Sequence, residues 1–334
     1  METVSRREFM AVSGAISLGA STLAMGNAPE EAGIEYGKIR GFNYQPGYGG
    51  TLQYIWTGFD RKVWEREVPW CKRFGANMLR VWLDWQAYLA VGGAFLDSVT
   101  QALDVLGKHG LQMMPVLFNR WNDARYPHGG VGDRDLVAGD VSKFWPYVDA
   151  LLNRFGSDPR VAIWDVCNEP QAPWNKFGEV NDAETRWLGA VIERMRSATK
   201  KPITVGTMSG DNVERFAGLV DVISFHPYTD RIGHMDELCD VHEKIAAKHG
   251  KPLICTEACR GSFDDQERGR QARDDVEALE RHEIGWLLWH LCESRFVTGN
   301  RERTDDNALH PGQGYMPFVL ADGTTRPGHE WLER

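Results

Sequence analysis

Two glutamates, Glu169 and Glu257, each follow a short apolar run of strand type, in the segments 164–170 (WDVCNEP) and 253–257 (LICTE). In a barrel of repeated strand and helix units, such residues lie at the carboxyl ends of different strands and point into one mouth. Hydrolysis of a glycosidic bond needs two carboxyl groups on either side of the bond, one to protonate the leaving oxygen and one to attack or to activate water. The pair therefore predicts glycoside hydrolysis.

The elements that must position these glutamates follow from hydrophobic periodicity. From residue 35 onward, apolar strand patterns alternate with amphipathic helix patterns, which is typical of α/β proteins. Strands are expected at 39–45, 77–85, 111–121, 161–169, 202–208, 220–228, 252–257 and 284–291, and helices at 61–74, 96–109, 142–155, 183–200, 235–249 and 266–282. No Gly-x-Gly-x-x-Gly follows the first strand, which disfavours a dinucleotide-binding sheet. We therefore predict one α/β domain, a (β/α)8 TIM barrel, over residues 29–334.

Composition narrows the function classes. The 334-residue chain has a net charge of −9, which disfavours nucleic acid or an anionic membrane as a partner. Its six cysteines form no Cys-x-x-Cys pair and are too scattered for a disulfide framework of the small secreted kind. We expect a monomer that binds a β-glycan or oligosaccharide, with no cofactor and no metal.

The first 28 residues read as a targeting segment rather than as part of the fold. Residues 5–10 (SRREFM) resemble a twin-arginine export signal, and 11–25 is a weakly apolar stretch too short to span a bilayer. An ordinary amphipathic N-terminal helix is the alternative interpretation. We expect a signal peptide over residues 1–28 and a periplasmic or secreted protein with no membrane contact after its removal.

Several motifs in the same order as the expected strands resemble a known group. These are Asn-Glu-Pro at 168–170, Glu257, Arg80, His-Pro-Tyr at 226–228 and Trp289. Together they resemble the retaining β-glycosidases of clan A, in particular glycoside hydrolase family 5, the cellulase and β-mannanase family. The resemblance covers about residues 35 to 292. It implies a retaining β-glycosidase that works by double displacement on a β-linked oligo- or polysaccharide.

The resemblance also implies roles. Glu169 matches the acid/base, which needs a raised pKa that apolar surroundings and the negative charge of Glu257 would supply. Glu257 matches the nucleophile, which must be ionised and therefore needs donors, for which Arg80 and Tyr228 are the candidates. A carboxyl separation of roughly 5 Å would imply retention of configuration. Asn168 is expected to donate to the sugar 2-hydroxyl.

Further substrate contacts are expected from Asn119, Trp121, His226 and Trp289. Asn119 ends the third strand, where many family members carry a histidine, and this departure leaves the preferred sugar open. Plain structural roles are the alternatives. Arg80 could pair with a core carboxylate such as Asp84, His226 could be a buried rim histidine, and Trp289 could be core packing.

Two other functions stay open. One is a metal-dependent barrel hydrolase or isomerase that uses His226, Glu257 and His290 as ligands. The other is a degenerate barrel that only binds sugar, although both carboxylates are present. Two long connections, 122–140 and 293–316, follow the third and eighth strands and are candidates for shaping the cleft.

Overall fold

In the computed structural model, the first strand begins at Arg40, directly after a 3₁₀ turn over Tyr36–Lys38 and Ile39. The residues whose structure is described are 33–121, 130–132, 140–170, 182–208, 210–301 and 314–334. The segment 1–28, predicted to be a signal peptide, lies outside these residues. None of the helices described is long and apolar enough to cross a membrane.

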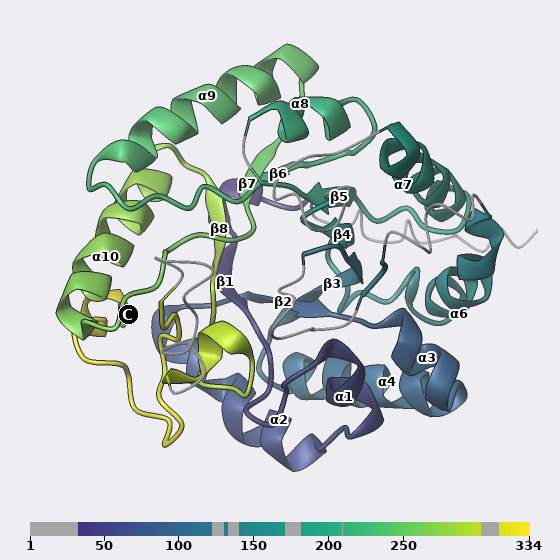
Figure 1. Cartoon of the computed structure of the whole chain (residues 1–334), viewed down its shortest axis with the longest axis horizontal. Coiled ribbons are helices and arrows are strands. Elements are labelled where there is room, and N and C mark those ends of the chain that lie inside the picture. Colours follow the sequence, from purple (N-terminus) through teal and green to yellow (C-terminus); the bar gives the residue numbers. More distant parts are fainter. Residues whose placement is uncertain (1–32, 122–129, 133–139, 171–181, 209, 302–313) are drawn as a thin grey trace, which may run out of the picture. The chain divides into compact units, whose positions relative to one another are not determined.

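Eight parallel strands form the barrel, and each is shorter than the sequence pattern predicts. They are β1 (Arg40–Asn43), β2 (Met78–Trp82), β3 (Gln112–Asn119), β4 (Trp164–Asn168), β5 (Ile203–Gly206), β6 (Ile223–Phe225), β7 (Leu253–Cys255) and β8 (Gly285–Leu288). Their order is β5-β4-β3-β2-β1-β8-β7-β6, and a parallel bridge between Thr207 and Phe225 joins the two ends of the sheet. The result is the predicted single-domain (β/α)8 barrel, nearly closed (Figure 1).

Helices surround the strands in Figure 1. They are α1 (Leu52–Thr57), α2 (Arg61–Glu67), α3 (Trp85–Val91), α4 (Gly93–Lys108), α6 (Trp145–Phe155), α7 (Asp182–Arg196), α8 (Asp211–Ala217), α9 (His234–His249) and α10 (Asp265–Arg281), with 3₁₀ turns η1 (Tyr36–Lys38), η2 (Val68–Phe74), η3 (Val141–Phe144), η4 (Val297–Gly299) and η5 (Glu330–Leu332). The sequence pattern misses the short helices α1, α3 and α8. The helix predicted at 61–74 changes to 3₁₀ geometry at η2, where a proline occupies one of the first positions.

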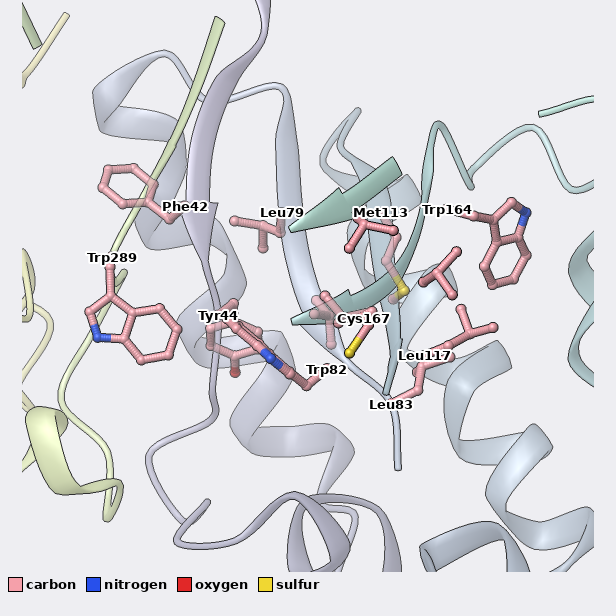
Figure 2. Close-up of a cluster of buried hydrophobic side chains, with 14 of the residues drawn as sticks. Phe42, Tyr44, Leu79, Trp82, Leu83, Met113, Leu117, Trp164, Cys167 and Trp289 are labelled. Carbon is pink, nitrogen blue, oxygen red and sulfur yellow. The ribbon is translucent and has the colours of Figure 1, made fainter. Parts of the chain in front are cut away.

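The apolar core lies between the strands and the helices, and side-chain alternation along each strand separates it from a polar barrel interior. On β1, Phe42 points to the core, where its ring centroid lies 5.3 Å from those of Phe74 and Phe318 (Figure 2). Its neighbour Asn43 points the opposite way and is completely buried among polar groups. The interior near the carboxyl ends of the strands is therefore built for polar contacts.

Candidate active site

Glu169 and Glu257 lie together at the carboxyl ends of β4 and β7. Glu169 directly follows β4 in a left-handed backbone conformation (φ 44°), and its N–H donates to the carbonyl oxygen of Gly206 at 2.7 Å. Both side chains are buried, with 5% and 4% of each residue exposed. One carboxylate oxygen of Glu169, one of Glu257 and a ring nitrogen of His226 all lie within 4.8 Å of one another. The structure thus brings the two predicted carboxyl groups close enough to act on one bond.

Both donors predicted for Glu257 are present. Arg80 Nη1 donates to Glu257 Oε1 at 2.6 Å, and the Tyr228 hydroxyl donates to Oε2 at 2.8 Å. Burial raises the pKa of Glu257, and repulsion from Glu169 adds to that, whereas His226, Arg80 and Tyr228 lower it. The hydrogen bonds favour the ionised form of this carboxyl group in a setting that otherwise disfavours charge.

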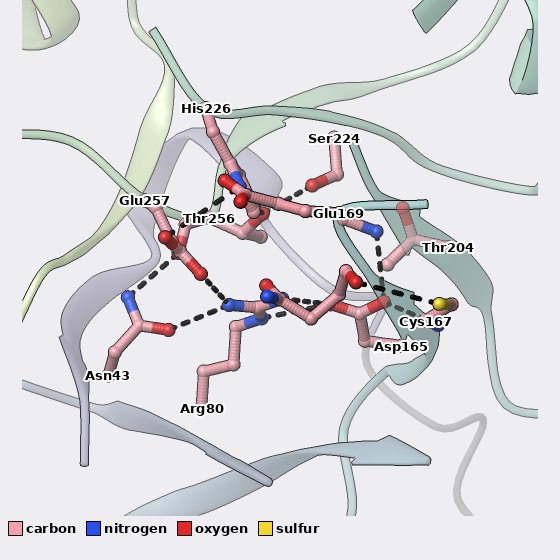
Figure 3. Close-up of polar contacts among 12 residues, drawn as sticks. Asn43, Arg80, Asp165, Cys167, Glu169, Thr204, Ser224, His226, Thr256 and Glu257 are labelled. Atoms are coloured by element: carbon pink, nitrogen blue, oxygen red, sulfur yellow. Dashed lines mark hydrogen bonds and ion pairs between the residues drawn. The ribbon is translucent and has the colours of Figure 1, made fainter. Parts of the chain in front are cut away.

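Arg80 is the hub of the buried network in Figure 3. It is fully buried, and besides Glu257 its guanidinium donates to Asp165 (Nε at 2.9 Å), Asn43 (Nη1 at 2.9 Å) and Asn168 (Nη2 at 2.8 Å). The alternative pairing of Arg80 with a core carboxylate does form, but with Asp165 and not with Asp84, whose carboxylate caps the first turn of α3. Arg80 therefore bridges the carboxylates on β4 and after β7.

Asp165 and Gly206 complete this network, and the sequence analysis did not single out either. Asp165 Oδ1 accepts from the N–H groups of Gly206 (2.9 Å) and Cys167 (3.2 Å), while Oδ2 faces Arg80. A Cβ atom on Gly206 would lie 2.6 Å from Arg80 Nη2 and 2.8 Å from Asp165 Oδ2. Strand β5 leaves room for the buried ion pair only because position 206 has no side chain. The signal for Asp165 was an ionisable residue inside an otherwise apolar strand.

His226 contacts Glu169 rather than standing apart at the rim. Its Nδ1 lies 2.8 Å from Glu169 Oε1. Burial raises the pKa of Glu169 to about 7, and Arg80 acts against this. The raised value was predicted, and of its two expected causes the apolar surroundings account for it, whereas the charge of Glu257 does not contribute. Burial also lowers the pKa of His226 to about 4, so the ring is neutral near pH 7.

A second hydrogen-bonded chain links Asn168 to the third strand. Asn168 Nδ2 donates to Asn119 Oδ1 at 3.0 Å, and Asn119 Nδ2 donates to the carbonyl oxygen of Trp121 at 2.6 Å. Asn168 Oδ1 accepts from Arg80, and Nδ2 gives one of its two N–H groups to Asn119. The second N–H of Asn168 is therefore not used by these bonds. Asn119 is only 3% exposed and orients Asn168. Neither of these two hydrogen bonds joins Asn119 to a glutamate.

Trp289 and Trp121 are mostly buried, with 7% and 9% of each residue exposed. Trp289 packs edge-on against Trp82 (5.0 Å between centroids), and its Nε1 donates to Thr298 Oγ1 at 2.9 Å. Phe296 lies between the two tryptophans, with its ring centroid 5.6 Å from that of Trp289 and 6.2 Å from that of Trp121. Of the two long connections predicted at 122–140 and 293–316, residues 122–129, 133–139 and 302–313 lie outside the described part of the chain. Trp289 thus has the packing contacts of the alternative interpretation, and the substrate contacts of both tryptophans stay a prediction.

The ligand set of the alternative metal-dependent function, His226, Glu257 and His290, does not come together within the part of the chain that the structure describes. The ligand-type atoms that gather around His226 and Glu257 belong to Glu169 instead. Arg80 places a guanidinium 2.6 Å from Glu257, and its positive charge opposes a divalent cation at that carboxylate. These residues suit proton transfer better than metal binding.

A (β/α)8 barrel with two facing carboxyl groups after its fourth and seventh strands belongs to the class of glycoside hydrolase barrels. Residues 55–295 match the model of the cellulase family, glycosyl hydrolase family 5. The chain belongs to this family.

Relatives agree with that assignment. A probable mannan endo-1,4-β-mannosidase from Aspergillus terreus is 20% identical over 189 residues, which cover 48% of each protein, so the match spans about half the length of this relative. An exo-β-1,4-mannosidase from Opitutaceae bacterium strain TAV5 has a similar structure, with a TM-score of 0.68 at 15% identity, over 88% of this chain and 58% of that one. An endo-1,4-β-D-mannanase from Thermotoga petrophila gives a TM-score of 0.63 at 16% identity, over 88% and 98%. These two likenesses show a shared fold.

Proposed function

We propose that the protein is a retaining β-glycosidase that hydrolyses O-glycosidic bonds of a β-linked oligo- or polysaccharide. The observation that carries the proposal is the approach of Glu169 and Glu257, whose nearest carboxylate oxygens lie within 4.8 Å. Retaining enzymes hold their carboxyl groups about 5 Å apart, whereas inverting enzymes leave roughly 6.5 to 9.5 Å for a water molecule. The geometry supports double displacement.

The hydrogen bonds divide the two roles. Glu257 has a cationic donor in Arg80 and a neutral donor in Tyr228, which favour its ionised form and make it the nucleophile. Glu169 has only the neutral His226 ring as a side-chain partner in these bonds, and its pKa of about 7 lets it hold a proton at neutral pH. It is the acid/base.

The reaction then proceeds in two balanced steps. Glu257 attacks the anomeric carbon and forms a glycosyl ester, while Glu169 gives its proton to the departing oxygen. In the second step Glu169 takes a proton from water, whose oxygen attacks the anomeric carbon and releases Glu257. Both carboxyl groups return to their starting states.

The substrate we propose is a β-1,4-linked mannoside. The support is that the relatives named above carry the names of β-1,4-mannosidases or mannanases. A panel of aryl β-mannosides, β-glucosides and β-glycans separates these substrates.

The test of the mechanism is the stereochemical course, followed by proton NMR with an aryl β-glycoside that the panel shows to be cleaved. The first product should be the β anomer, followed by mutarotation. Release of the α anomer first would overturn the retaining mechanism. Lack of hydrolysis across the whole panel would overturn the proposed activity itself.

We also propose export through the twin-arginine pathway. This pathway carries folded proteins, and the six cysteines of this chain are all buried and free, so that folding in a reducing compartment requires no disulfide. Replacing Arg6 and Arg7 together with lysine should leave the protein in the cytoplasm in a cell fractionation experiment. Unchanged export of this variant would exclude the pathway.

A further inference from the structure

Two buried hydroxyl groups extend the hydrogen bonds of His226 beyond its Nε2 atom (Figure 3). Thr256, the residue before Glu257, places its Oγ1 2.9 Å from His226 Nε2. The Ser224 hydroxyl, on β6, is hydrogen-bonded to the same Thr256 oxygen. Thr256 is completely buried and Ser224 is 2% exposed. A continuous chain of hydrogen bonds therefore runs from Ser224 through Thr256 and His226 to the carboxyl group of Glu169.

The direction of this chain follows from counting protons. Among the described residues, Thr256 Oγ1 is the only side-chain or backbone partner of the Ser224 hydroxyl, and Thr256 Oγ1 has only Ser224 and His226 as partners. If His226 donated from Nε2 to Thr256, one of the two hydroxyl protons would have no acceptor. If Ser224 donates to Thr256 and Thr256 donates to Nε2, every proton has an acceptor. Buried donors without an acceptor are costly, so the second arrangement is favoured.

We infer that Thr256 is a positioning residue that holds His226 as the tautomer protonated on Nδ1, so that this N–H donates to Oε1 of Glu169 throughout the reaction. The inference rests on the proposed acid/base role of Glu169. In the opposite tautomer Nδ1 accepts, and the proton of Glu169 would face the ring. With Oε1 held as an acceptor, Oε2 is the oxygen that carries the proton to the glycosidic bond and later removes one from water.

The charged and titratable groups around the ring are compatible with a neutral His226. Glu257 Oε2 lies 3.7 Å from Nδ1, and Arg80 and Asp165 act electrostatically on the ring from β2 and β4. Tyr228, two residues along the chain, donates to Glu257. Burial outweighs the two carboxylates, and the pKa of His226 falls to about 4. Near pH 7 the ring therefore carries one proton, whose position Thr256 determines.

The direct test is the tautomer of the resting protein, measured by two-dimensional NMR after ¹⁵N labelling of the histidine rings, with His226 assigned from a His226→Gln variant. We expect a protonated Nδ1 and an unprotonated Nε2 from about pH 5 to 8. A protonated Nε2, or an imidazolium ring at pH 7, would overturn the inference. The measurement uses no substrate, so its outcome is independent of whether the proposed glycosidase activity is found.

A matched pair of variants tests the consequence for turnover. Thr256→Val removes the hydroxyl with little change in volume. Nε2 of His226 then loses its donor, which makes the Nδ1–H group a weaker donor to the Glu169 carboxylate, so we expect the basic limb of the kcat/KM profile to move to higher pH, and kcat to fall roughly fivefold at constant KM. Thr204→Val is the control, because Thr204 is equally buried but donates to the backbone oxygen of Val222 at 2.7 Å.

Thr204→Val should keep the pH profile of the wild type, and Thr256→Ser, which retains the hydroxyl, should restore it. If Thr256→Val folds and keeps both the basic limb and the Nδ1 proton, Thr256 does not set the tautomer. If Thr256→Val does not fold, the NMR measurement on the wild type remains the test, and a protonated Nε2 there would overturn the inference.

Discussion

His226 Nδ1 lies 2.8 Å from Oε1 of Glu169 and 3.7 Å from Oε2 of Glu257, so one ring faces both carboxyl groups. Because burial keeps the ring neutral near pH 7, it adds no positive charge beside the two carboxyl groups. The ring therefore donates a hydrogen bond to the carboxyl pair. The proton that the proposed mechanism transfers to substrate stays on Glu169 and is not taken up by the ring.

Glu169→Ala should reduce hydrolysis of glycosides with poor leaving groups far more than hydrolysis of activated aryl glycosides, because only the poor leaving groups need protonation to depart. The comparison is of kcat/KM for the two substrate types on the same preparation. Added azide should restore turnover of the activated substrate and give a β-glycosyl azide. Equal losses on both substrates, with no effect of azide, would show that Glu169 is not the acid.

Glu169→Gln should stabilise the protein in a pH-dependent way. The pKa of Glu169 rises from 4.5 to about 7 on folding, so the folded state binds more protons in this range, and the wild type loses stability as pH rises. The variant avoids this loss, so its advantage should grow from near zero below pH 4.5 to as much as about 3 kcal/mol above pH 7. Thermal unfolding from acid to alkaline pH measures it.

The control for that experiment is Asp84→Asn, which removes a second buried carboxyl group whose pKa burial raises to about 7. It should show a similar trend in stability and leave the pH profile of activity unchanged, because Asp84 caps α3 instead of facing the glutamates. A constant difference in melting temperature between Glu169→Gln and the wild type would mean that folding does not raise the pKa of Glu169.

A 2-deoxy-2-fluoro β-glycoside with a good leaving group should label Glu257. The fluorine slows breakdown of the covalent intermediate, because it destabilises the oxocarbenium-like transition state. Peptide mapping by mass spectrometry locates the label, and Glu257→Ala should remain unlabelled while still folding. A sugar that the panel shows to be cleaved must be used. A label on another carboxyl group, such as Asp84 or Glu293, would make the assignment of the nucleophile wrong.

Arg80→Lys should lower both stability and activity. Lysine keeps the charge but cannot reach Asp165, Asn43 and Glu257 together, and a weakened buried pair typically costs about 3 kcal/mol or more. Glu257 also loses a donor, so the acidic limb of the kcat/KM profile should move to higher pH. Arg273→Lys, in an exposed pair with Glu277, is the control and should leave both properties level. An Arg80→Lys variant as stable and active as the wild type would contradict the proposed network.

The sequence pattern predicts the barrel because each strand is a separate apolar run between amphipathic helices, and parallel strands need such helices as connections. Boundaries are less predictable. The apolar run at 77–85 continues through Trp85, but Asp84 caps a helix there, so the strand ends at Trp82. Short helices such as α1 carry too few turns for their periodicity to be recognised.

The candidate site is predictable where residue type alone carries the chemistry, as for the two glutamates and Tyr228. The partners of Arg80 are not, because they depend on strand register. Arg80 pairs in register with Met114 on β3, and Asp165 lies one strand further along the sheet, opposite Val116. No local pattern in the sequence predicts that register. The same register brings Arg80 and Asp165 against position 206, where only glycine leaves room for them.

The double pairing of Arg80 has a consequence for the charge balance of the reaction. In the resting site Arg80 faces two anions, Asp165 and Glu257. In the proposed mechanism, Glu169 has just released its proton when Glu257 becomes an uncharged ester, so the site would again contain one cation and two anions. Asp165 keeps Arg80 paired during this exchange, and a buried guanidinium without a counter-ion, which would be costly, does not arise. Negative charge can thus pass from the end of β7 to the end of β4 without an ion entering from solvent.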